Sequence, residues 1–331
     1  MPPLRRRLVP VVALLVLAPW VGEYLLGNLS VRVLPLLPVL VPLYGGGALL
    51  VRELARRTGR GWPTILLLAT AYGVIEAGLV DQSLFNLTFE ALDQTGVTPV
   101  PWLGLSAYNA AGFLLGHTIW SVAVPIALAE LWAGDLRHRP WLGRWGLTAT
   151  GALYLLGCWM IFQDLREREG FLARPHQLAA AAATAVVLVA LAFLVPKPAP
   201  GGPLRWDRGG PRPWLVGVGS FVAASAWILR PENWVGFGAG AVIVVAAAVV
   251  VAWLARQPWW GAGHHLALVG GTLLTYAWAG FALTAILEPD DPVRWLGNAA
   301  FAATAVVLLV VTAVLLRRRR PTGAPTVPAA V

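Results

Sequence analysis

Residues 62–86, WPTILLLATAYGVIEAGLVDQSLFN, decide the fold because this stretch is apolar over a length that crosses a lipid bilayer. Glu76 stands near its middle. A carboxylate at that depth costs from about 2.5 kcal/mol on insertion scales to several times more in simulations. Such a group needs a partner inside the protein. The stretch therefore predicts both a transmembrane helix and a buried polar site.

Apolar runs of this kind recur along the whole chain of 331 residues, which is 58% hydrophobic and 12% charged. With a mean hydropathy of +0.68, the sequence predicts an all-α polytopic membrane helical bundle. The lone cysteine, Cys158, excludes a disulfide framework. The basic residues stand in short clusters beside the apolar runs. We therefore expect contact with membrane lipid and no binding of nucleic acid.

We predict ten transmembrane helices, each long enough at about 1.5 Å per residue to cross about 30 Å of hydrocarbon. They cover residues 8–27, 33–51, 62–87, 107–133, 143–163, 174–195, 214–230, 234–255, 264–287 and 294–316. If both termini are cytoplasmic, nineteen of the 25 basic residues fall on the inner side. The six others are Arg32, Arg166, Arg168, Arg174, Arg230 and Arg294. This bias follows the positive-inside rule and predicts a multi-pass protein of the plasma membrane.

A segment rich in Pro and Gly, residues 196–213, separates six predicted spans from four and is expected to be a cytoplasmic linker. Residues 1–195 form a six-span module that carries the unusual polar groups. Residues 214–317 form a four-span module of mostly Ala, Val, Leu and Gly, which we interpret as packing scaffold. Residues 318–331 are expected to be a disordered basic tail. The excess of Arg over Lys indicates a bacterial, GC-rich genome.

Polar side chains from three spans are predicted to lie at a similar depth. Helical rise places Glu23 about 22 Å and Glu76 about 21 Å from the inner ends of their spans, and His117 about 15 Å from the outer end of its span. Other polar residues share the faces of these helices. The predicted substrate-binding pocket comprises Glu23, Tyr72, Glu76, Ser83, Asn86, Asn109, His117, Trp120 and Ser121.

Some polar groups have simpler interpretations. Glu76 would also be stable as a protonated acid that hydrogen-bonds to a neighbouring helix, because burial disfavours the charged carboxylate. His117 alone would suit a hydrogen bond between helices. We expect Asp81 to lie at the outer interface and Glu130 to be solvated near the inner end.

The second predicted span is interrupted by Pro35, Pro38 and Pro42, followed by the glycines of residues 45–47. Proline removes intrahelical hydrogen bonds, so this helix should kink or unwind. Broken helices line the binding sites of many transporters. The alternative is close packing, in which glycine admits a neighbouring helix.

Motifs for other chemistry are missing from the sequence. It has no Walker lysine, no GxSxG and no HExxH. His264 and His265 have no third ligand near them in the sequence, so an interfacial role is favoured. We predict neither a metal site nor a cofactor.

Two short motifs resemble those of the intramembrane glutamyl proteases that process CAAX proteins and bacteriocins. Glu76 takes the position of the first glutamate in the family's EExxxR motif, and residues 113–117, FLLGH, fit its FxxxH motif. The resemblance implies that Glu76 activates a water and that His117 stabilises the oxyanion. Ala77 stands at the second glutamate position, and the arginine and the later HxxxN or HxxxD motif are missing.

These observations lead to three hypotheses. The first is a carrier or binding protein for a small or amphipathic substrate, with Glu76 as the group that responds to a proton or cation. The second is an intramembrane hydrolase, with Glu76 as general base and His117 in support. The third is a noncatalytic membrane scaffold. A short distance between Glu76 and His117 would be compatible with the hydrolase hypothesis.

Overall fold

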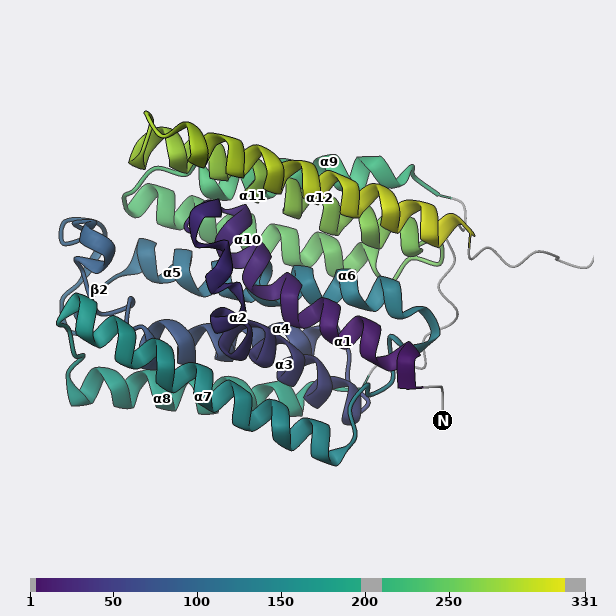
Figure 1. The fold of residues 1–331 in the computed structure, drawn as a ribbon, viewed down its shortest axis with the longest axis horizontal. Coiled ribbons are helices and arrows are strands. Elements are labelled where there is room, and N and C mark those ends of the chain that lie inside the picture. Colours follow the sequence, from purple (N-terminus) through teal and green to yellow (C-terminus); the bar gives the residue numbers. More distant parts are fainter. Residues whose placement is uncertain (1–3, 198–209, 319–331) are drawn as a thin grey trace, which may run out of the picture.

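The protein is a bundle of helices, as a computed structural model that describes residues 4–197 and 210–318 shows (Figure 1). The predicted all-α class is confirmed, since the described strands form a single two-residue hairpin, β1 (Pro99–Val100) with β2 (Leu105–Ser106). Most of the predicted linker, residues 198–209, and the tail beyond Arg318 lie outside the described residues.

Nine helical segments within the described ranges are long and apolar enough to cross a membrane. They are Arg6–Leu25, Val31–Arg57, Trp62–Val80, Ala107–Leu136, Arg144–Glu169, Pro175–Leu194, Trp234–Leu254, Ala262–Leu287 and Pro292–Arg318. The remaining predicted span, 214–230, is the shorter apolar helix α9 (Pro213–Ile228). It packs along α11 (Ala262–Leu287), where Ser220 donates a hydrogen bond to the Leu268 carbonyl over 2.9 Å.

The first four spans are composite helices, and each contains a π-helical segment with hydrogen bonds from residue i+5 to residue i. Their parts are α1 (Leu4–Pro19) and η1 (Trp20–Leu25); η2 (Val31–Leu36), α2 (Leu37–Leu40), η3 (Val41–Gly45) and α3 (Gly46–Arg57); α4 (Trp62–Ile75) and η4 (Glu76–Val80); α5 (Ala107–Leu115), η6 (Gly116–Ala123) and α6 (Val124–Ala133). The π-helical segments are η1, η3, η4 and η6. Proline lacks the N–H of an α-helical bond. Pro19, Pro42 and Pro125 stand in or next to η1, η3 and η6.

The remaining elements are short turns and longer outer helices. They are η5 (Phe89–Ala91), η7 (Gly134–Leu136), α7 (Arg144–Glu169), α8 (Pro175–Leu194), α10 (Trp234–Leu254) and α12 (Pro292–Arg318). Large apolar side chains on α7 and α10 are exposed, among them Trp159 and Val242. Such faces suit contact with lipid, whereas α4 and α11 are mostly buried.

The third span ends at Val80, so the prediction that this helix continues to residue 87 is wrong. The Asp81 carboxylate accepts a hydrogen bond from the Ser83 backbone N–H over 2.8 Å, and Gln82 has a φ of +59°. A short acidic side chain that bonds its own backbone competes with helix formation. Ser83 and Asn86 therefore do not share a helical face with Tyr72 and Glu76.

The two predicted modules share one of the hydrophobic cores. Leu17 and Trp120 from the first half of the chain pack in a cluster with Leu273 and Phe301 from the second half. The division of the chain into a six-span module followed by a four-span module stays a prediction.

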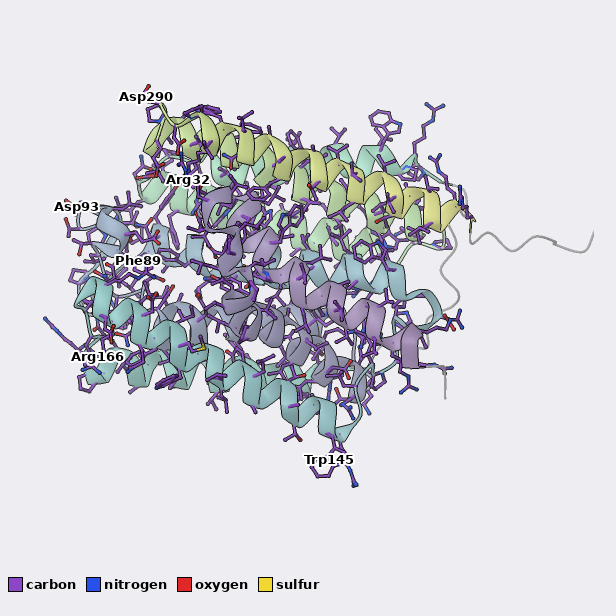
Figure 2. All side chains as sticks on the ribbon, viewed as in Figure 1. Arg32, Phe89, Asp93, Trp145, Arg166 and Asp290 are labelled. Carbon is purple, nitrogen blue, oxygen red and sulfur yellow. The ribbon has the colours of Figure 1, made fainter. Side chains whose placement is uncertain are left out.

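Loop residues gather at the two ends of the bundle. Figure 2 shows the loop residues Asp93 and Asp290 near one end, together with Arg166 at the C-terminal end of α7, and Trp145 at the start of α7 near the other end. The first turn of α1 and the last turn of α12 lie at the same end (Figure 1).

The glycines of span two serve close packing. A Cβ atom on Gly45 would overlap the backbone of Leu15, and one on Gly47 would overlap the ring of Tyr72. The packing interpretation therefore accounts for these glycines, while Pro42 lies within the π-helical segment.

We predict that Gly45→Ala lowers the melting temperature of the protein in detergent, because backbone atoms of Leu15 cannot yield as a flexible side chain would. Overpacking of this kind costs about 1–3 kcal/mol. The matched control is Gly151→Ala in α7, where nothing lies within 4 Å of the added Cβ. The control should be neutral or stabilising, by up to about 1 kcal/mol. Equal melting temperatures for wild type and Gly45→Ala would contradict this packing.

Candidate functional site

Four polar side chains from the first four spans meet inside the bundle, and each comes from a π-helical segment. Glu23 lies in η1, Tyr44 in η3, Glu76 begins η4, and His117 lies in η6. Single π turns inside α-helices are rare and frequently occur at functional sites. Their coincidence at all four positions marks this cluster as the candidate site.

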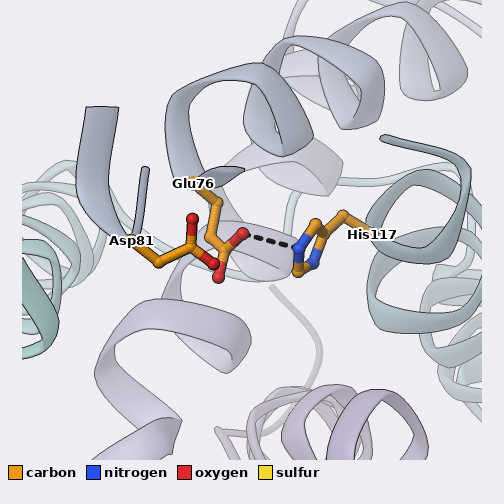
Figure 3. Close-up of side chains that lie close together, drawn as sticks. All are labelled: Glu76, Asp81 and His117. Atoms are coloured by element: carbon orange, nitrogen blue, oxygen red, sulfur yellow. Dashed lines mark ion pairs between the residues drawn. The ribbon is translucent and has the colours of Figure 1, made fainter. Parts of the chain in front are cut away.

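Glu76 is at the centre of the cluster. Its Oε2 atom lies 2.5 Å from Nε2 of His117, which is an ion-pair contact (Figure 3). The Tyr44 hydroxyl donates a hydrogen bond to Oε1 of Glu23 over 2.6 Å and also lies 3.4 Å from Oε1 of Glu76. Behind the imidazole, Oγ of Ser121 lies 3.5 Å from Nδ1 of His117. The hydroxyl of Tyr44 thus bridges two carboxylates, and the second of them contacts a histidine.

Asp81 joins this group from the turn after η4. One carboxylate oxygen of Glu76, one of Asp81 and one ring nitrogen of His117 all lie within 4.8 Å of one another (Figure 3). The Asp81 N–H donates to the Glu76 carbonyl over 2.9 Å, which is a bond from residue i+5 to residue i. This hydrogen bond places Asp81 one π-helical turn after Glu76, so the two acidic residues lie close together.

The cluster is largely enclosed by protein. Glu76 is 2% exposed and His117 is 9% exposed, and the ring of Tyr72 lies edge-on to the imidazole with 6.1 Å between centroids. A cavity of about 10 Å³ adjoins Asp81 and is bounded by Phe162 and Leu165. That volume is close to the minimum that holds one water.

The cluster contains more acids than bases. Glu23, Glu76 and Asp81 supply three carboxylates, and His117 is the one cationic partner within ion-pair distance of them in the described part of the chain. Several uncompensated carboxylates in a low-dielectric interior are strongly unfavourable. The arrangement therefore calls for bound protons or a bound cation.

The structure brings together only some of the predicted pocket residues. Glu23, Tyr72, Glu76, His117 and Ser121 belong to the cluster or touch it, and Ser83 caps Asp81 through its backbone. The other three predicted residues make separate contacts.

Asn86 donates to Glu169 over 3.0 Å, and Asn109 donates to Ser106 at the start of α5. Trp120 stacks on Tyr276 with 4.3 Å between ring centroids. Their partners Glu169, Ser106 and Tyr276 lie outside the cluster, and a pocket shared with Glu76 and His117 stays a prediction for these three residues.

Sequence reasoning missed two members, Tyr44 and Asp81. The proline run marked span two as irregular but did not single out Tyr44. A helical wheel at about 100° per residue turns Asp81 well away from Glu76, because it assumes an α-helix throughout. The signal for Asp81 is its place five residues after Glu76, which aligns the two only in a π turn.

A separate ionic cluster ties the C-terminal halves of α3 and α6 together. Arg52 and Arg56 both contact the Glu130 carboxylate, at 3.1 and 2.6 Å, and Arg52 also pairs with Glu53 at 2.6 Å. Glu130 is 4% exposed, so the expectation that it is solvated is wrong. Its charge is compensated by two guanidinium groups.

The histidine pair of span nine shows no metal geometry at His264. Its Nε2 lies 2.8 Å from the Pro211 carbonyl, and its Nδ1 accepts the Gly261 N–H over 3.3 Å. Both ring nitrogens of this fully buried residue are therefore engaged by backbone.

No family model, no curated protein and no solved structure matches this chain.

We predict that Tyr44→Phe lowers the melting temperature, because it removes the hydroxyl that donates to Glu23 and lies beside Glu76. Hydrogen bonds to charged groups contribute about 1.5–3 kcal/mol. Tyr72→Phe is the matched control, since the buried Tyr72 hydroxyl has no hydrogen-bond partner among the described residues. The control should be neutral or stabilising. Equal losses in the two variants would show that the bridge does not contribute.

Proposed function

We propose that this protein is a membrane carrier or binding protein whose substrate step is coupled to binding of a proton or cation at Glu76 and its neighbours. The observation that carries the proposal is the excess of acid in the enclosed cluster. The cluster holds three carboxylates and one imidazole, so its charge state depends on what it binds. Ionisable groups inside a membrane typically mark proton relays and ion pathways.

The irregular second span supports the carrier hypothesis. It contributes Tyr44 from a π-helical segment, and it continues through α3 to the ionic cluster at the inner end. Discontinuous helices supply ion and substrate sites in many transporters because their half-helix ends and unwound backbone offer free polar groups. In this protein one such helix links the acidic cluster to Arg52 and Arg56.

An intramembrane hydrolase is the second candidate, favoured by the 2.5 Å approach of Glu76 to His117. In that mechanism Glu76 is the general base that takes a proton from water, and His117 stabilises the developing negative charge, as the resemblance to glutamyl proteases implies. The small cavity beside Asp81 offers room for about one water. In water enriched in heavy oxygen, a hydrolase inserts the isotope into its products, whereas a carrier leaves its substrate chemically unchanged.

We further propose a bacterial plasma-membrane protein with ten spans and both termini in the cytoplasm. The bias of nineteen among 25 basic residues supports this orientation. The common position of the first turn of α1 and the last turn of α12 supports an even number of crossings, with α9 as the tenth (Figure 1).

In cells that carry Cys158→Ala, a membrane-impermeant maleimide should label Thr95→Cys from outside and should leave Lys197→Cys unlabelled until the membrane is permeabilised. Both positions are exposed and lie on loops at opposite predicted sides of the membrane. Immediate labelling of Lys197→Cys in intact cells would overturn the proposed orientation.

The functional prediction concerns Glu76→Gln, which keeps the shape of a protonated acid but can neither exchange a proton nor carry charge. The wild-type melting temperature should vary with pH, since each proton that folding takes up or releases contributes about 1.4 kcal/mol per pH unit. A change of this size in the free energy of unfolding shifts the melting temperature by a few degrees for a chain of this length. The Gln variant should give a flatter profile.

The control for this comparison is Glu232→Gln, which alters an exposed glutamate outside the cluster. Its pH profile should follow that of the wild type. Identical profiles for the wild type and Glu76→Gln would remove the support for proton coupling at Glu76.

A further inference from the structure

We propose that Glu76, Asp81 and His117 form a binding site for one divalent transition-metal ion of the zinc type. The proposal goes beyond proton coupling, because it assigns a ligand class to three named side chains. It also revises the expectation that the protein has no metal site, which followed from the lack of a zinc-binding motif in the sequence.

The separations suit a single small ion. One donor atom from each residue lies within 4.8 Å of the other two. Ligands at about 2.1 Å from a tetrahedral ion stand about 3.4 Å apart. Nε2 of His117 and Oε2 of Glu76, now 2.5 Å apart, would separate by about 1 Å to admit the ion. A rotation of the flexible Glu76 side chain supplies such a movement.

Each proposed ligand is oriented through its other polar atom. Oε1 of Glu76 faces the Tyr44 hydroxyl at 3.4 Å, Oδ1 of Asp81 accepts the Ser83 N–H at 2.8 Å, and Nδ1 of His117 lies 3.5 Å from Ser121 Oγ. Such outer contacts fix the direction and tautomer of ligands in metal sites.

A buried atom without a hydrogen bond also points to a ligand. Oε2 of Glu76 is buried and receives no hydrogen bond within the described part of the protein, although the His117 ring lies against it. A buried carboxylate oxygen normally has a donor or a cation. A metal ion between Glu76 and His117 replaces their contact with a ligand bond to each side chain.

Charge favours the same occupant. Two carboxylates and a neutral imidazole balance a divalent cation, so the loaded site is electrically neutral in the apolar interior. A neutral complex avoids most of the desolvation penalty that a net charge would incur. Glu23 keeps its own donors, Tyr44 and Asn28.

The donor set also limits the identity of the ion. Imidazole with carboxylates suits zinc, manganese and iron, whereas magnesium and calcium prefer six or more oxygen ligands. Three protein ligands leave a fourth position open for water or substrate, as in catalytic and exchangeable zinc sites.

The test measures zinc bound to untagged, purified protein in detergent after chelator treatment and dialysis against zinc. Elemental analysis should find about one zinc per chain, as a three-ligand site predicts. Excess magnesium should not displace it. Asp81→Asn and His117→Gln should each weaken zinc binding by about 100-fold or more, since the loss of an outer partner alone costs about 10–100-fold.

Matched controls are Asp93→Asn and His176→Gln, which make the same chemical changes at exposed positions. Both should bind zinc as the wild type does. If the ligand variants do not fold, Ser121→Ala keeps all three ligands and should weaken binding by about 10–100-fold. The proposal is overturned if the wild type retains no zinc, or if these cluster variants bind zinc as tightly as the controls. A failure here with an intact pH response at Glu76 would remove the metal site and leave proton coupling standing.

Discussion

The structure depends on how a carboxylate is accommodated in the apolar interior at Glu76. An isolated charge there is too unfavourable to persist, so the surrounding helices must provide partners. They do so by departing from α-helical geometry, because the four π-helical segments turn Glu23, Tyr44, Glu76 and His117 toward one another. Irregular backbone is tolerated at membrane depth where it is buried in protein. Fold and site thus have a common physical origin.

The ionic cluster between α3 and α6 shows a different solution to charge burial. There Glu53 and Glu130 meet Arg52, Arg56 and Arg57, so each carboxylate has guanidinium partners and no acid is left uncompensated. The guanidinium of Arg52 also stacks on Trp141, 3.4 Å from the ring centroid, and bonds to loop carbonyls. That cluster is suited to holding helices together. The central cluster, with acid in excess, is suited to binding.

The coarse fold could be predicted from the sequence because bilayer thickness sets the length of apolar helices. The depth of Glu76 and His117 followed from helical rise, and these two side chains do meet. Their partners could not be found in the same way. Asp81 requires a π turn, and Tyr44 requires the bend in a proline-rich span, while Ser83 and Asn86 leave the predicted face because the helix ends at Val80. Helical wheels fail where hydrogen bonding changes register.

Both proposed roles of the central cluster require an exchangeable positive charge, either as protons or as a metal ion. The most direct measurement is the infrared absorption of carboxyl groups in metal-free protein in bilayers at neutral pH, with Glu76→Gln as reference. We predict a protonated carboxyl signal that the variant lacks or shifts, and that disappears from the wild type when zinc is added. Fully ionised carboxylates in the metal-free wild type, unchanged by zinc, would contradict this prediction.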